Sequence, residues 1–80
     1  MNPLDNAETQ VRLAGLYLMA GRIGPAKELL NHAVGVLERH GGPTLAEAVQ
    51  MLAFAEEQSG RPEEAQRWRE VASNLAAANN

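Results

Sequence analysis

The side chains suited to acid–base chemistry or metal binding are few in this chain and lie far apart. Its two histidines, His32 and His40, are separated by about 12 Å along a helix, which is too far for one metal ion to join them. The acidic pairs at 56–57 and 63–64 are adjacent in sequence, and adjacent residues on a helix point in different directions. No serine or threonine has a histidine and an acid at a suggestive spacing. We therefore expect no enzyme, no cofactor and no metal site.

The composition disfavours several kinds of partner. The chain has 80 residues, a formal net charge of −3 and no cysteine, so it has neither disulfides nor thiolate metal ligands. An acidic chain without a basic cluster is not expected to bind nucleic acid or an anionic membrane. The longest apolar run, Leu13–Ala20, is about eight residues and too short to span a bilayer. We expect a cytoplasmic protein with no membrane insertion.

Glycine and proline divide the chain into four segments rich in helix-forming residues. Glycines follow the apolar-periodic stretches, where a helix C-terminus favours a left-handed residue, and prolines follow shortly after, where a new helix starts. Asp5 and Thr44 each precede a glutamate by three residues, which is the spacing of a capping box at a helix start. The pattern predicts four helices, at about 4–20, 25–40, 45–59 and 62–78.

A shift of 39 residues superposes the first half of the chain on the second. It aligns the Gly-Arg pair at 21–22 with that at 60–61, together with several small residues and the predicted helix starts. A single helical hairpin cannot bury its apolar face alone, so two such hairpins are expected to stack. We therefore predict two tandem helix-turn-helix repeats, the first at about 4–40 and the second at about 44–78.

The small residues indicate how the helices pack. Ala14 and Ala26 flank the first turn, and Ala53 and Ala65 flank the second; two antiparallel helices approach closely where both present a methyl group. We expect one all-α domain over 1–80, a short α-solenoid of four antiparallel helices. The residues expected to pack within and between the repeats are Leu13, Ala14, Tyr17, Gly21, Ala26, Leu30, Ala33, Leu52, Ala53, Gly60, Ala65, Trp68 and Ala72.

These residues resemble the signature of the tetratricopeptide repeat. The first half carries it at Leu13-Ala14, Tyr17, Gly21-Arg22, Ala26, Leu30 and Ala33. The second half carries it more weakly, at Leu52-Ala53, Gly60-Arg61, Ala65 and Ala72. The stretch at 36–43 is similar to the longer variant of kinesin light chains and many bacterial repeat proteins, in which Val/Leu-Leu-Glu precedes a Gly-Pro linker. The resemblance implies a concave face, lined by the first helix of each repeat, that holds peptides.

The chain departs from the family pattern in two respects. Its linker is shorter, which affects the stacking angle, and Glu56 stands where the first repeat has Tyr17. By the resemblance, a clamp on a terminal carboxylate would need Lys, Arg or Asn at four positions, which here are Val11, Gly15, Glu47 and Met51. Recognition of chaperone tails by such a clamp is therefore not expected.

The first predicted helix has more apolar surface than one packed side requires. It is apolar nearly all round from 13 to 20, whereas a helix with one solvated side shows a stripe about 100° wide. The functional interpretation is an apolar concave groove for a helical or extended segment of another protein. The alternative is ordinary core against the third helix. The expected contact residues are Val11, Leu18, Met19 and Phe54, with Gln50 and Gln58 as a hydrogen-bonding rim.

Three interpretations of this surface remain open. The leading one is an adaptor or scaffold that binds another protein or peptide. The second is a homodimer that buries the apolar surplus of the first helix and so enlarges a small core. The third is a structural module without a ligand.

The outer side of the last helix is polar, as a terminal repeat requires, so we expect the array to end there. Its residues Gln66, Arg69 and Ser73 align with Lys27, Leu30 and Val34.

Overall fold

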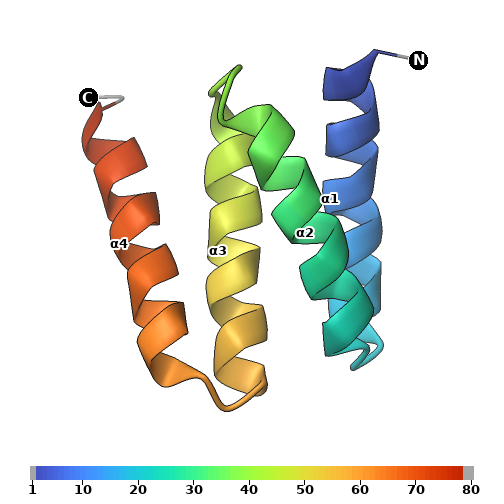
Figure 1. The fold of residues 1–80 in the computed structure, drawn as a ribbon, viewed down its shortest axis with the longest axis vertical. Helices are drawn as coiled ribbons and strands as arrows, with labels where there is room; N and C mark the ends of the chain where they lie inside the picture. The colour runs from blue at the N-terminus through green and yellow to red at the C-terminus, as the bar shows by residue number, and fades with distance from the viewer. Residues whose placement is uncertain (1, 79–80) are drawn as a thin grey trace.

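The computed structural model describes residues 2–78, which form four α-helices (Figure 1). They are α1 (Pro3–Met19), α2 (Ile23–Leu37), α3 (Pro43–Gln58) and α4 (Pro62–Ala78). Successive helices run in opposite directions, so both termini and the α2–α3 loop lie at the same end of the molecule. The predicted all-α fold of two hairpins is confirmed, and each helix boundary lies within three residues of its predicted place. We call α1 with α2 the first unit, and α3 with α4 the second.

The helix starts differ from the predicted capping boxes. Asn2 caps α1, because its Oδ1 accepts a hydrogen bond of 2.8 Å from a backbone N–H in the first turn. Asp5 lies within that turn. Thr44 lies inside α3, which begins at Pro43, and its hydroxyl donates to the Glu8 carboxylate at 3.5 Å. Both predicted capping boxes are therefore wrong, since each helix begins before the residue that was expected to cap it.

The two hairpin turns have the same backbone geometry. Gly21 and Gly60 have φ values of 77° and 76°, in the left-handed region that glycine adopts without strain. In each turn, the residue after the glycine donates its N–H to the carbonyl oxygen five residues earlier, at 2.8 Å in the first unit and 2.9 Å in the second. The shift of 39 residues therefore identifies structurally equivalent positions as well as similar residues.

The core lies within the hairpins and between α2 and α3. Within the hairpins, α1 packs against α2 and α3 packs against α4. Between the hairpins, α2 packs against α3, and α1 makes a smaller contact with α3. Ala14, Ala26, Ala53 and Ala65 are all buried, so the helices approach closely beside both turns. The other expected packing residues are buried (Leu30, Ala33, Leu52) or partly buried (Tyr17, Trp68, Ala72), apart from Leu13 and the two turn glycines.

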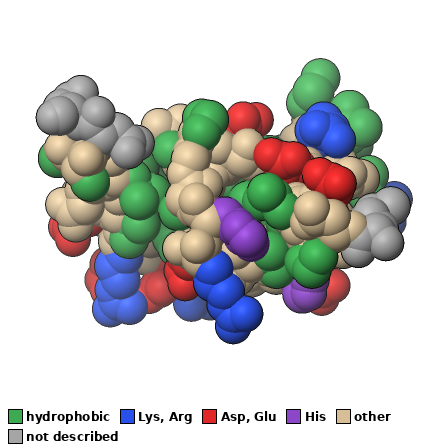
Figure 2. Space-filling model, turned by 90° about the horizontal axis from the view of Figure 1, so that it is seen from above, with side chains coloured by type: hydrophobic (Ala, Val, Ile, Leu, Met, Phe, Trp, Pro, Cys, Tyr) green, Lys and Arg blue, Asp and Glu red, His purple; other side chains and the backbone are tan. Residues whose placement is uncertain are grey.

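The molecule is a thin slab of 31 × 30 × 16 Å. Figure 2 looks onto the end that carries both termini, where hydrophobic side chains are interspersed with acidic, basic and histidine side chains. None of the helices in residues 2–78 is both long and apolar enough to cross a membrane.

Candidate protein-binding surface

One side of α3 is covered by α2. Val49 and Leu52 are fully buried and share a side of α3 with Glu56 by helical spacing, and Glu56 is 8% exposed. The Lys27 ammonium of α2 lies 2.6 Å from Glu56 Oε1, so an ion pair joins the two units at the end of this contact. In the second unit, these three positions therefore belong to the interface with the preceding helix.

The equivalent positions in α1 are not covered by any helix in residues 2–78. A shift of 39 residues places Gln10, Leu13 and Tyr17 where α3 has Val49, Leu52 and Glu56. Leu13 was expected to pack inside the first hairpin but is 40% exposed, because it lies on the side of α1 that faces away from α3. Gln10 and Tyr17 are only partly buried. The first unit thus leaves open a surface that its counterpart in the second unit buries.

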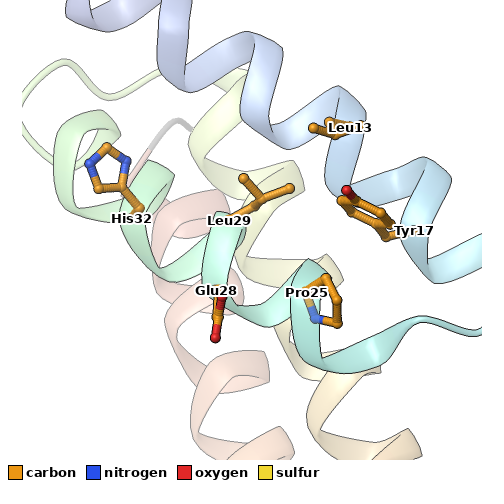
Figure 3. Close-up of a pocket in the computed structure, with 6 residues that line it drawn as sticks. All are labelled: Leu13, Tyr17, Pro25, Glu28, Leu29 and His32. Carbon is orange, nitrogen blue, oxygen red and sulfur yellow. The ribbon is translucent and has the colours of Figure 1, made fainter.

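This open surface is hollowed between α1 and α2, as Figure 3 shows. Leu13 and Tyr17 from α1 stand across from Leu29 of α2, and the hollow holds about 260 Å³. Glu28, on the same stretch of α2, projects away from α1. We call this hollow the N-terminal groove; its lining residues are Leu13, Tyr17, Pro25, Glu28, Leu29 and His32.

A polar contact marks the middle of the same face. His32 Nδ1–H donates to Gln10 Oε1 at 2.9 Å, which joins α2 to α1 across their contact. His32 also lines a second hollow, which continues between the two helices toward Pro3 and His40. The outer face of the first unit is therefore apolar at its Tyr17 end and more polar beyond His32.

The charges at the end of the groove differ from those at the equivalent place in the second unit. The Arg22 guanidinium lies over the Tyr17 ring, 5.5 Å from its centroid, in a cation–π contact. At the equivalent positions, Arg61 Nε lies 3.6 Å from the Glu56 carboxylate that also receives Lys27. A carboxylate between two cations in the second unit is thus replaced by a neutral ring under one cation in the first.

The contact residues predicted from the sequence do not form one groove. Val11 is 2% exposed and belongs to the core, so its assignment as a contact residue is wrong. Leu18 is partly buried against the core, whereas Met19 is 86% exposed. The first helix therefore has an exposed apolar surface, but its composition differs from the prediction.

The predicted residues of α3 lie elsewhere. Phe54 is 49% exposed, and with Gln50 it lines a hollow of about 260 Å³ against Arg69 of α4 rather than against α1. Gln58 is exposed at the end of α3. Phe54 is equivalent to Gly15, the residue of α1 that lies close to Met51 of α3.

The sequence analysis missed the contribution of α2 to the open surface. Pro25, Leu29 and His32 line the N-terminal groove, and none was among the predicted contact residues. Leu16, which is 63% exposed, belongs to the apolar stretch predicted at 13–20 but was not among the predicted contact residues. The shift of 39 residues carried a usable signal, because it aligns Leu29 with Trp68, a half-buried residue packed against the core of the second unit.

Comparison with known proteins adds no assignment to this surface. No protein-family model matches the chain, and no similar curated protein or solved structure was found. Within residues 2–78, no three His, Asp or Glu side chains are grouped so that they could hold a metal ion.

Proposed function

We propose that this chain is a protein-interaction module of two tetratricopeptide-type hairpins, and that it binds an amphipathic helix of another protein in the N-terminal groove. One observation carries the proposal. The positions that α2 covers in the second unit are open in the first, where Leu13, Tyr17 and Leu29 present apolar surface. The activity is binding without a catalytic step, as an adaptor or scaffold.

The size of the face supports a single helix as the ligand. The slab measures 31 × 30 × 16 Å, so one edge offers a face of roughly 30 by 16 Å. A helix is about 10 Å wide, and the 15-residue α2 already covers the equivalent surface of α3. A ligand helix of similar length therefore fits.

Self-association of the chain is the alternative, and two features oppose its head-to-tail form. Phe54 stands at the position equivalent to Gly15, where even a Cβ would lie 3.3 Å from Met51 Cε. A further copy docked on α3 and α4 as the second unit docks on the first would have to accommodate that ring where the first unit has only a glycine. The outer side of α4 also has Arg69 where α2 has the buried Leu30. Light scattering over a concentration range tests for a second copy.

A peptide of residues 22–38, which contains α2, is a suitable probe for the groove. We expect this peptide, labelled with fluorescein, to bind the full chain in a fluorescence-anisotropy titration. Leu13→Asp places a charge in the groove and should weaken binding at least about tenfold. Val71→Asp is a matched control, because Val71 in α4 is 39% exposed and Leu13 is 40% exposed. Equal effects of the two substitutions, or no binding at all, would contradict the proposal.

A further inference from the structure

We infer that the N-terminal groove selects a helix with an acidic residue at the position where α2 has Lys27. This inference rests on the proposed function and adds the chemistry of the ligand. It follows from comparing the charged groups that α2 meets on the second unit with those that a bound helix would meet on the first.

On the second unit, a lysine of the covering helix is matched by a carboxylate. The Lys27 side chain is 24% exposed, and its ammonium lies 2.6 Å from the Glu56 carboxylate, whose side chain is 10% exposed. Arg61 approaches the same carboxylate oxygen at 3.6 Å. The carboxylate therefore lies between the two cations and screens their mutual repulsion. Without that carboxylate, the two partly desolvated cations would repel each other.

On the first unit, that carboxylate is missing. Tyr17 takes the place of Glu56, while Arg22 keeps the place of Arg61 and lies over the Tyr17 ring. Glu28, the acidic residue in the lining of the groove, projects away from α1. A lysine of a bound helix would therefore meet the Arg22 cation and a neutral ring. An aspartate or glutamate at the same place would instead form a charge-assisted hydrogen bond with Arg22.

The rest of the recognition pattern comes from the buried residues of α2 that lie on the same side of the helix as Lys27. Leu30, Val34 and Leu37 follow Lys27 by three, seven and ten residues, and all three are buried. This is the spacing of one apolar helix face. The ligand expected for the groove is thus an amphipathic helix with an acidic residue three positions before the first of three apolar anchors.

Two peptides distinguish this chemistry from simple apolar binding. The first has the sequence of residues 22–38, and the second is the same peptide with Lys27→Glu. We expect the full chain to bind the glutamate peptide about fivefold more tightly, because one repulsive charge contact is exchanged for an attractive one. Raising the ionic strength should reduce this preference, since the charges involved are partly exposed.

Substitutions in the protein test the assigned groups. Tyr17→Glu creates in the first unit the arrangement of the second, and should reverse the preference in favour of the lysine peptide. Tyr17→Phe is the control and should leave the preference for glutamate unchanged. Arg22→Ala, at an exposed position that places little demand on folding, should abolish the preference. Circular dichroism confirms that each variant is helical before its binding is compared.

The outcomes separate this inference from the proposed function. If both peptides bind equally and Leu13→Asp weakens both, the groove is the binding site and the charge selection is wrong. An unchanged preference in Tyr17→Glu or in Arg22→Ala would also overturn the inference. If neither peptide binds, the proposed function itself fails. A rise in the mass of the free chain with concentration would instead identify a second copy as the ligand.

Discussion

The two units have the same turns and the same small-residue contacts, but their first helices have different neighbours. α3 lies between α2 and α4, whereas α1 packs mainly against α2. Equivalent leucines show the effect, since Leu52 is fully buried and Leu13 is 40% exposed. The repeated sequence determines the shape of each hairpin, and the neighbouring helix determines whether an equivalent residue is core or surface. Within residues 2–78, the surface of the first unit is open because no helix packs on α1 as α2 packs on α3.

The largest predicted change in the free energy of unfolding distinguishes substitutions at these two leucines. Leu52→Ala removes a fully buried side chain and is expected to lower the free energy of unfolding by about 2–5 kcal/mol. Leu13→Ala leaves no enclosed cavity and should cost less than about 1 kcal/mol. Urea denaturation followed by circular dichroism measures both. Equal losses would show that α1 and α3 do not differ in environment as described.

Enlarging the small residues beside the turns should affect the two units similarly. Ala26 and Ala65 are fully buried at equivalent positions. Ala26→Leu and Ala65→Leu should each destabilise the fold by about 1–3 kcal/mol through overpacking. The measurement is the shift of the denaturation midpoint relative to the unchanged chain. If only one substitution is harmful, the packing of the two hairpins is less alike than their turns.

The ion pair between the units should contribute less than the core. Glu56→Ala removes the carboxylate that Lys27 and Arg61 share, with an expected loss of about 1–2 kcal/mol in the free energy of unfolding. Glu57→Ala is the matched control, because this neighbouring glutamate pairs with Arg69 in an exposed ion pair. Thermal denaturation of both variants tests the difference. A loss as large for Glu57→Ala would remove the distinction between the buried and the exposed pair.

The smallest effect on stability is expected at the exposed end of α1. Met19→Glu alters a side chain that is 86% exposed and should change the free energy of unfolding by less than about 0.5 kcal/mol. Leu18→Glu introduces a charge next to the core and should cost clearly more. Chemical denaturation of the two single variants resolves their roles. Similar losses for both would mean that Met19 also packs in the folded protein.

Much of the fold could be predicted from the sequence because its signals are local. The Gly-Arg turns at 21–22 and 60–61 and the prolines after the turns marked four helices, and the shift of 39 residues marked two hairpins. The capping boxes at Asp5 and Thr44 were wrong because both helices begin earlier: Asn2 caps α1, and α3 begins at Pro43 with Gly42 at its N-cap position.

The candidate surface was predicted less well because it depends on contacts between helices. The apolar excess of the first helix was visible in the sequence, but not which of its sides α3 would cover. As a result, Val11, which was predicted to contact a partner, is part of the core, and Leu13, which was predicted to pack in the hairpin, is exposed. The absence of an aromatic residue at Glu56 was also visible. The ion pair of Glu56 with Lys27 was not visible, since these two residues are brought together only when the units stack.

The most direct test of the central claim is an NMR titration of the isotope-labelled chain with the glutamate form of the 22–38 peptide. If the first unit has an open counterpart of the surface that α2 covers on α3, the largest amide shift changes should fall at Leu13, Tyr17 and Leu29. Changes confined to Gln50 and Phe54 on α3, or no changes at saturating peptide, would contradict the account.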